Sequence, residues 1–328
     1  MKKRILVTRE VFDETIEFLQ GQFEVESNQT DRLFGRDDLV AVLRGKDGVQ
    51  TSSSDRVDGE LLDLCPTVKA VCNTAVGYNN IDIEACTRRG VMVTNTPGVL
   101  TDSVADYSIG MVIATCRRMT EGENYLRSGE WKGTFLKQIL GQDVHGATLG
   151  LLGFGRIGQA IARRARGFDM KILYHSRNRA APEAEEESGA VYVGKEELLR
   201  RADVLLLILP YTPETHHCIG PKELSMMKPS AVLVNMARGG IVDDAALIQA
   251  LKNKTIRAAG LDVYENEPKL NTGFLELKNV VLSPHIASAS EPTRRAMAMT
   301  AAKNLVAALS GETPPNLLNP DYRKNSKA

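Results

Sequence analysis

Three residues in the second half of the chain have side chains suited to acid–base chemistry at a bound anion: Arg238, Glu267 and His285. A guanidinium can hold a carboxylate through two parallel hydrogen bonds. An imidazole can give or take a proton near neutral pH. A carboxylate beside an imidazole orients the ring and raises its pKa. Together the three predict a site that binds a small carboxylate and transfers a proton to or from it.

Each of these residues follows a short apolar run that predicts a buried strand of a parallel sheet. The runs are Ala231–Asn235, Ala258–Leu261 and Val280–Leu282. Ligands of open α/β sheets bind beyond the carboxyl ends of the strands, so the sheet would bring the three side chains to one edge. Taken singly each has a plainer interpretation, since a histidine after a strand can be purely structural and Arg238 can belong to a helix-entry turn.

A glycine-rich turn predicts a dinucleotide site in the same half. Leu149–Leu152 predicts a strand, the motif G-x-G-x-x-G runs from Gly153 through Gly155 to Gly158, and apolar residues then recur at helical spacing. The glycines permit a tight turn, close approach of a pyrophosphate to the backbone, and close helix–strand packing. The helix directs its unpaired N–H groups at the phosphates. The cofactor contacts expected here are Gly153, Gly155, Arg156, Ile157 and Gly158.

The residues after the second strand, Lys171–His175, favour NADP(H) over NAD(H). An acid at this position would hydrogen-bond the ribose of NAD, whereas basic and small polar residues suit a 2′-phosphate. The chain has no acid between Met170 and Pro182, and we expect Ser176, Arg177 and Arg179 to surround the phosphate. The alternative is that the two arginines are simply solvated and that NAD(H) is used.

Composition predicts an ordinary soluble protein. The 328 residues are enough for two domains, 43% are hydrophobic, and 41 basic residues balance 41 acidic ones, so no overall charge attracts nucleic acid or an anionic membrane. No apolar run is long enough for a signal peptide or a membrane span. The five cysteines form no CxxC pair and predict reduced thiols in a cytoplasmic protein. We expect no metal site, because His216 and His217 alone are a poor ligand set.

The first hundred residues alternate short β-like and helical runs, which predicts a second parallel sheet with helices on both faces. This part contains no G-x-G-x-x-G. Within it, the segment TAVGYNN, Thr74–Asn80, follows a strand and includes a glycine that allows a ligand to approach the backbone; a plain strand-to-helix connection is the alternative.

Three further segments lie outside the predicted sheets. Thr101 begins a long apolar helix. Asn124–Gln142 is less regular and reads as an extended arm or a surface excursion, and Glu291–Leu309 predicts a closing amphipathic helix.

Six motifs in order give the chain a family resemblance. They are NTAVGYNNID, GLLGFGRIG, LPYTPETHH, NMARGGIVDDAAL, AAGLDVYENEP and LSPHIASAS. The chain resembles the D-isomer-specific 2-hydroxyacid dehydrogenases over nearly its whole length, most closely their glyoxylate/hydroxypyruvate (2-ketogluconate) reductase branch. The resemblance implies an α/β fold in which a doubly wound Rossmann nucleotide domain, residues 100–290, is inserted into a flavodoxin-like substrate domain, residues 1–99, with the helix of 291–328 returning to the latter.

The resemblance also implies roles for individual residues. Arg238 would anchor the substrate carboxylate and carbonyl, His285 would be the acid/base and Glu267 its partner, and the backbone at Val76 and Gly77 would complete the carboxylate site. Besides the glycine turn, the matching cofactor positions are Thr101, Pro210, Thr215, Ala237, Asp262 and Ser288. A homodimer with the Asn124–Gln142 arm at its interface is implied as well.

The expected reaction is NAD(P)H-dependent reduction of a small 2-oxo acid to a D-2-hydroxy acid, with glyoxylate, hydroxypyruvate and 2-ketogluconate as candidate substrates. Two other functions fit the same fold. One is oxidation of phosphite or formate, since a small anion also satisfies Arg238. The other is a non-catalytic NAD(H)-sensing protein like the transcriptional corepressors of this fold.

Overall fold

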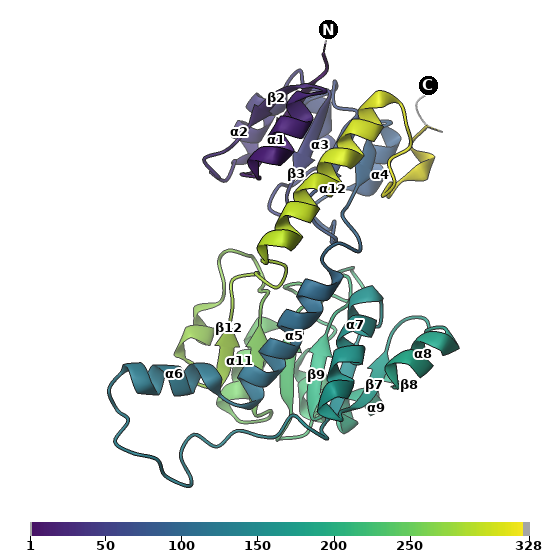
Figure 1. The fold of residues 1–328 in the computed structure, drawn as a ribbon. Helices are drawn as coiled ribbons and strands as arrows, with labels where there is room; N and C mark the ends of the chain where they lie inside the picture. The colour runs from purple at the N-terminus through teal and green to yellow at the C-terminus, as the bar shows by residue number, and fades with distance from the viewer. Residues whose placement is uncertain (1, 324–328) are drawn as a thin grey trace. The chain divides into compact units, whose positions relative to one another are not determined.

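The structure is a computed structural model that describes residues 2–323; the last five residues of the predicted C-terminal segment lie outside this range. The chain divides into two compact units (Figure 1). Unit 1 contains the residues up to Leu100 and those from Ala289 onward, and unit 2 spans Thr101–Ser288. Unit 2 is therefore inserted, as one continuous segment, between the two parts of unit 1.

Unit 1 is built on a five-stranded parallel sheet with the order β2-β1-β3-β4-β5. This is the order of flavodoxin-like doubly wound folds. The strands are β1 (Arg4–Val7), β2 (Glu24–Ser27), β3 (Gly48–Thr51), β4 (Ala70–Asn73) and β5 (Met92–Thr94). The helices are α1 (Asp13–Gln20), α2 (Arg36–Leu43), α3 (Gly59–Leu64), α4 (Ile83–Arg88) and α12 (Glu291–Ser310).

Both faces of this sheet are covered. Ile5 and Val7 of β1 pack with α1 and α12 on one face, whereas Leu6 belongs to the cluster formed with α2, α3 and α4 on the other. This alternation follows from the two-residue period of a strand and explains why Ile5, Leu6 and Val7 are all apolar although they face opposite sides of the sheet. Asn319 then joins the end of the chain to β5, because its side chain accepts the Val93 N–H and donates to the Val91 carbonyl, each at 2.9 Å.

Unit 2 is built on a seven-stranded parallel sheet with the order β12-β11-β10-β9-β6-β7-β8. Counted along the unit this is the Rossmann order 3-2-1-4-5-6 with one further strand. The strands are β6 (Thr148–Leu152), β7 (Lys171–His175), β8 (Ala190–Tyr192), β9 (Val204–Leu207), β10 (Val232–Asn235), β11 (Ala258–Leu261) and β12 (Val280–Leu282). The two sheets confirm the expected fold class of two doubly wound α/β domains.

Helices cover both faces of the second sheet. The helices of the unit are α5 (Thr101–Cys116), α6 (Met119–Arg127), α7 (Arg156–Ala165), α8 (Pro182–Ser188), α9 (Lys195–Arg201), α10 (Pro221–Met226) and α11 (Asp244–Lys252). Helix α6 is the exception to this covering role, because it packs on α5 and none of its residues is buried. Helices α5 and α7 pack together, and α5 also lies on β10 and β11. Residues of α9, α10 and α11 form a buried cluster with the opposite side chains of the central strands.

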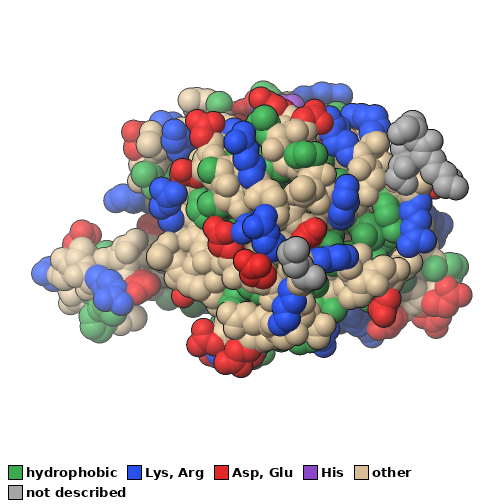
Figure 2. All heavy atoms as spheres, turned by 90° about the horizontal axis from the view of Figure 1, so that it is seen from above, with side chains coloured by type: hydrophobic (Ala, Val, Ile, Leu, Met, Phe, Trp, Pro, Cys, Tyr) green, Lys and Arg blue, Asp and Glu red, His purple; other side chains and the backbone are tan. Residues whose placement is uncertain are grey.

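The structure can be compared with what composition predicted about membrane spans, surface charge and cysteines. No helix within residues 2–323 is both long and apolar enough to cross a bilayer. The face drawn in Figure 2 carries lysine, arginine and carboxylate side chains intermixed rather than in a single-sign patch. The five cysteines are free thiols, four of them buried, and burial raises the pKa of Cys72 and Cys86 to about 12.

Two parts of the sequence interpretation need correction. The predicted irregular arm begins too early, because α6 continues to Arg127 and only the residues after it are irregular. Strands β2 and β8 and helix α2 were also not anticipated. Both strands lie at sheet edges, and β2 alternates exposed and half-buried side chains, so it lacks the continuous apolar run of a central strand.

Candidate active site

Three neighbouring strands of unit 2 place the predicted acid–base residues at one sheet edge. Strands β10, β11 and β12 are adjacent and parallel, so their carboxyl ends lie together. Arg238 follows β10, Glu267 follows β11 and His285 follows β12. The sheet thereby brings together residues separated by up to 47 positions in the sequence.

His285 and Glu267 form a direct hydrogen bond, with 2.7 Å between Nδ1 of the imidazole and Oε2 of the carboxylate. The other carboxylate oxygen, Oε1, accepts the backbone N–H of Tyr264 at 2.8 Å. A carboxylate held at both oxygens orients the imidazole, which then donates through Nδ1. Nε2 of His285 makes no hydrogen bond with any residue in 2–323 and about a third of the side chain is exposed, so this nitrogen can reach a ligand.

The loop that carries Arg238 packs closely against the loop that carries Glu267. A Cβ at Gly239 would lie 1.7 Å from the carbonyl oxygen of Tyr264, so only glycine permits this approach. Asn235 fixes the same loop, because its side chain accepts the Ala237 N–H at 3.1 Å and donates to the Arg238 carbonyl at 3.2 Å. Arg238 itself donates from one guanidinium nitrogen to the Ala237 carbonyl at 2.7 Å.

Opposite charges in this group influence one another. Burial raises the pKa of Glu267, but the hydrogen bond and charge of His285, the Tyr264 N–H and the charge of Arg238 outweigh it and hold the pKa below its ordinary value. Burial lowers the pKa of Arg238, and the nearby Glu267 charge opposes that effect. Glu267 is therefore an anion near neutral pH, and the guanidinium remains a partly buried cation with donors to spare.

Asp262 anchors the loop that carries His285. Its buried carboxylate accepts the Ile286 N–H and the Ala287 N–H, each at 2.9 Å, and the Ser283 hydroxyl at 2.5 Å. The Tyr264 hydroxyl lies 2.9 Å from the Ser283 carbonyl and reinforces this loop. The predicted cofactor residue Asp262 thus also positions the loop of His285.

The glycine turn fits a dinucleotide. Gly153 has a φ of +101°, and a Cβ there would lie 2.4 Å from the Ile208 carbonyl oxygen, so a side chain is excluded. A Cβ at Gly158 would lie 2.7 Å from the Gly153 carbonyl, whereas the space beside Gly155 is open for 4 Å. No side chain caps the N-terminus of α7, which begins at Arg156. The turn therefore combines tight packing with an open approach to free backbone N–H groups.

The two arginines expected near a 2′-phosphate differ in their surroundings. Arg179 forms two hydrogen bonds of 2.8 Å to Glu185, whose pKa the arginine and the Tyr174 hydroxyl lower to about 2. Arg177 makes no ion pair with any residue in 2–323. The Ser176 hydroxyl donates to the Asn178 carbonyl at 2.6 Å. Arg177 is therefore the available cation of the loop, and Arg179 is already neutralised.

The remaining predicted cofactor positions lie in unit 2, at the start of α5 or in loops after its strands. Thr101 is the first residue of α5, and Ala237 precedes Arg238. Thr215 follows β9; its hydroxyl donates to the Pro210 carbonyl at 2.9 Å and accepts the Thr212 N–H at 2.7 Å. Ser288 is the last residue of the unit.

Val76 and Gly77 lie in unit 1, in the loop after β4. Their carbonyls accept side-chain amides of Asn95 at 2.8 Å and Asn73 at 2.9 Å. Neither backbone N–H has a hydrogen-bond partner among residues 2–323. The loop therefore has fixed carbonyls and two donors available to an anion.

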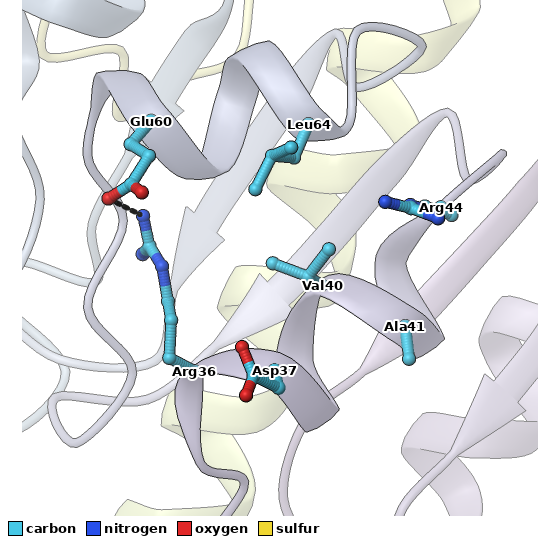
Figure 3. A pocket seen from close by; sticks show the side chains of 7 residues that line it. All are labelled: Arg36, Asp37, Val40, Ala41, Arg44, Glu60 and Leu64. Carbon is cyan, nitrogen blue, oxygen red and sulfur yellow. Dashed lines mark hydrogen bonds and ion pairs between the residues drawn. The ribbon is translucent and has the colours of Figure 1, made fainter.

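A separate pocket in unit 1 lies between α2 and α3 and contains none of the predicted site residues (Figure 3). It is lined by Arg36, Asp37, Val40, Ala41, Arg44, Glu60 and Leu64. Arg36 is bound to Asp58 at 2.6 Å and to Glu60 at 3.2 Å, as the dashed line to Glu60 marks in Figure 3. Its charge is therefore already matched.

Sequence reasoning missed several residues that support the site. Tyr264, Asn235 and Glu185 each act through a hydrogen bond to a residue that was identified. Glu265 was also missed; its carboxylate contacts Nε2 of His217, 48 residues away. Asn235 begins the quoted motif NMARGGIVDDAAL, and Tyr264 and Glu265 lie within AAGLDVYENEP, so motif membership was the only available signal.

Comparison with known proteins gives a family match and close relatives. The model of the D-isomer-specific 2-hydroxyacid dehydrogenase NAD-binding domain matches residues 109–287. A glyoxylate reductase of Thermococcus gammatolerans is 48% identical over 331 aligned residues, which cover 100% of this chain and 99% of the relative.

Solved structures of similar proteins point to the same family as the sequence comparison. A glyoxylate reductase from "Paecilomyes thermophila" aligns with a TM-score of 0.86 and 34% identity, covering 97% of this chain and 99% of that one. An NADPH-dependent glyoxylate/hydroxypyruvate reductase from Sinorhizobium meliloti, solved with NADP and malonate, aligns with a TM-score of 0.86 and 36% identity, covering 98% of each chain.

Proposed function

Because the chain belongs to the D-isomer-specific 2-hydroxyacid dehydrogenase family and is an oxidoreductase that reduces 2-oxo acids with NAD(P)H, we propose that its substrate is glyoxylate. Hydroxypyruvate is the proposed second substrate, because a 36% identical reductase acts on both. The proposal rests mainly on the His285–Glu267 pair, in which Nε2 of His285 is unpaired. This pair lies beyond the carboxyl ends of the same group of neighbouring strands that Arg238 follows.

We propose that the residues of unit 2 act as follows. A bound nicotinamide nucleotide supplies the hydride for the 2-oxo carbon. His285, held through Nδ1 by Glu267, gives a proton from Nε2 to the carbonyl oxygen, so the product is the 2-hydroxy acid. Arg238 binds the carboxylate and stabilises the negative charge that develops on that oxygen, an effect that is large where water is excluded. For Val76 and Gly77 of unit 1, binding of the substrate carboxylate stays a prediction, supported by their two unpaired N–H groups.

We propose NADP(H) as the preferred cofactor. Three features favour it: the absence of an acid after β7, the unpaired cation of Arg177, and the Ser176 hydroxyl beside it. The dinucleotide would be held by the turn of Gly153, Gly155 and Gly158 and by the N–H groups of Arg156 and Ile157. Thr101, Pro210, Thr215, Ala237, Asp262 and Ser288 stay the further predicted contacts. Arg179 is expected to contribute less than Arg177, because Glu185 already binds it.

We propose that the chain forms a homodimer through the arm that follows α6. Four large apolar side chains of this arm are more than half exposed: Trp131, Phe135, Leu136 and Leu140. Leu136 is 94% exposed, and exposed apolar side chains of this kind support the proposal of a protein interface. Sedimentation equilibrium of the wild type and of Leu136→Asp tests this; a monomeric wild type would contradict it.

The experiment that tests the function is a panel of initial rates. Glyoxylate, hydroxypyruvate and 2-ketogluconate are supplied with NADPH and with NADH, and phosphite and formate are supplied with the oxidised cofactors. We expect oxidation of NADPH by glyoxylate to give the highest kcat/KM. Turnover of phosphite or formate without turnover of any 2-oxo acid would establish the alternative reaction. Cofactor binding without any turnover would indicate a binding protein instead.

A further inference from the structure

His216, His217 and Glu265 form a cluster of metal-ligating side chains outside the acid–base group. The two histidines lie in the turn after β9, and Glu265 lies in the loop after β11. One ring nitrogen of each histidine and one carboxylate oxygen of Glu265 all lie within 4.8 Å of one another. No other set of three His, Cys, Asp or Glu side chains between residues 2 and 323 meets this spacing.

We propose that this cluster binds a zinc ion through His216, His217 and Glu265. Two imidazoles and one carboxylate form a ligand set that zinc accepts in proteins, and three protein ligands leave one position for water or a small ligand. The sequence alone argued against a metal site because two adjacent histidines are insufficient. Pairing of β10 with β9 and β11 supplies the third ligand from a distant loop.

The backbone holds the three ligands in place. The His217 N–H donates to the Gly240 carbonyl at 2.7 Å, and the His216 N–H donates to the Thr212 carbonyl at 3.0 Å. The Glu265 N–H donates to the buried carboxylate of Asp244 at 3.2 Å. A metal site needs ligands on ordered backbone, and these bonds meet that requirement before any ion binds.

The side chains are also oriented toward one another. Nε2 of His217 contacts Oε1 of Glu265 directly, and the two imidazole rings stack with their centroids 3.9 Å apart. The Tyr211 hydroxyl lies 3.1 Å from Nδ1 of His216, which leaves Nε2 of that ring for an ion, and outer contacts of this kind commonly orient metal ligands. Two ligand atoms of a tetrahedral ion at zinc–ligand distances of about 2.0–2.2 Å lie about 3.4 Å apart, so zinc would move the contacting atoms of His217 and Glu265 apart and replace their direct bond by two bonds to the ion.

Exposure lets an ion reach the cluster. The side chain of His217 is 37% exposed and that of Glu265 is 26% exposed, and His216 is exposed as a residue. A simple hydrogen-bonded pair of His217 and Glu265 would not need His216 beside it. The contribution of His216 therefore distinguishes a three-ligand metal site from an ordinary surface pair.

The test is calorimetric titration of untagged, chelator-treated protein with zinc chloride, without substrate or cofactor, so its outcome does not depend on the proposed reaction. We expect one ion per chain. His216→Ala, His217→Ala and Glu265→Gln should each raise the Kd about 10-fold or more. His145→Ala, an exposed histidine elsewhere in unit 2, and Cys218→Ser, the neighbouring thiol, should leave it unchanged.

A second measurement distinguishes loss of the metal ligands from misfolding of the variants. Titration with Co²⁺ should give the visible d–d absorption bands of a cobalt ion coordinated by imidazole and carboxylate. These bands should be lost in the three ligand variants, whose circular dichroism should match the wild type. The proposal is wrong if the wild type binds no zinc. It is also wrong if His216→Ala binds zinc as tightly as the wild type, which would leave only the ordinary pair.

Discussion

Nδ1 of His285 lies 2.7 Å from Oε2 of Glu267, and the second oxygen of that carboxylate accepts the Tyr264 N–H at 2.8 Å. The imidazole therefore has one nitrogen committed to the protein and one available to a substrate. Because Asp262 ties down the backbone on the far side of His285, both the ring and its loop are fixed. Pre-organisation of this kind is what the proposed role of His285 as a proton donor requires.

Replacement of His285 by alanine should lower kcat for glyoxylate reduction by about 10²–10⁴-fold, the usual contribution of a general acid or base. Cofactor affinity should change little, and fluorescence titration with NADPH measures it separately. His145→Ala is the matched control, since His145 is exposed and has no bond to the site. An unchanged kcat in His285→Ala would remove the histidine from the mechanism.

Replacement of Glu267 by glutamine should lower kcat for glyoxylate reduction by less than replacement of His285 does. The neutral amide keeps the size of the side chain, but a hydrogen bond from Nδ1 of His285 to an amide oxygen is weaker than one to a carboxylate. The imidazole should therefore be held less firmly, and initial rates with glyoxylate measure the loss. An unchanged kcat in Glu267→Gln would show that the carboxylate charge is not needed to hold His285.

Replacement of Arg238 by methionine should raise KM for glyoxylate and lower kcat together. The guanidinium would hold the substrate carboxylate in both ground and transition states and also stabilise the developing oxyanion. Arg238→Lys keeps the charge but loses the bidentate geometry, so it should retain part of kcat. A change in KM alone would restrict Arg238 to binding.

Substitution of the two arginines after β7 should separate their contributions to cofactor choice. Arg177→Ala should raise KM for NADPH by about 10-fold or more and leave KM for NADH nearly unchanged, because it removes an unpaired cation. Arg179→Ala should have a weaker effect, because Glu185 already binds that guanidinium through two hydrogen bonds. Equal effects of both substitutions would show that Glu185 releases Arg179 when the cofactor binds.

Much of the architecture could be read from sequence because parallel sheets bury both faces of their central strands. The predicted strands Lys171–His175, Ala258–Leu261 and Val280–Leu282 coincide with β7, β11 and β12. The edge strand β2 could not be found this way, since it reads Glu-Val-Glu-Ser and has no fully buried residue. A hydrophobic sequence pattern reveals a strand only where its side chains are buried, and an edge strand buries few of them.

The gathering of the candidate site residues could be predicted because the carboxyl ends of neighbouring parallel strands lie together. Arg238, Glu267 and His285 were identified because each follows a strand, and a parallel sheet gathers such positions. The contact of Glu265 with His217 and that of Glu185 with Arg179 depend on how loops and helices fold back, which no local pattern encodes. The same limit explains why a third ligand beside His216 and His217 was not foreseen.

Burial of Asp244 should make stability depend on pH in an unusual direction. Burial raises its pKa, the Glu265 N–H lowers it, and the charges of Glu265 and Asp243 raise it further, to about 6. An ordinary aspartate has a pKa of 3.8, so between these values the folded chain binds more protons than the unfolded one. The contribution of Asp244 is therefore fully favourable below about pH 4 and is lost as pH rises through 6.

Asp244→Asn should remove this dependence, because an amide does not titrate and can still accept the Glu265 N–H. Between pH 4 and 7 the free energy of unfolding of the wild type should fall relative to that of the variant by about 3 kcal/mol, at about 1.4 kcal/mol for each unit of pKa shift. Urea denaturation in the presence of a chelator measures both proteins independently of any bound metal. Asp203→Asn is the control of opposite sign, since burial raises the pKa of Asp203 but Lys228 and the Thr148 N–H hold it below its ordinary value. If the difference in free energy of unfolding between wild type and Asp244→Asn does not change from pH 4 to 7, the Asp244 carboxylate stays ionised in the folded protein over that range.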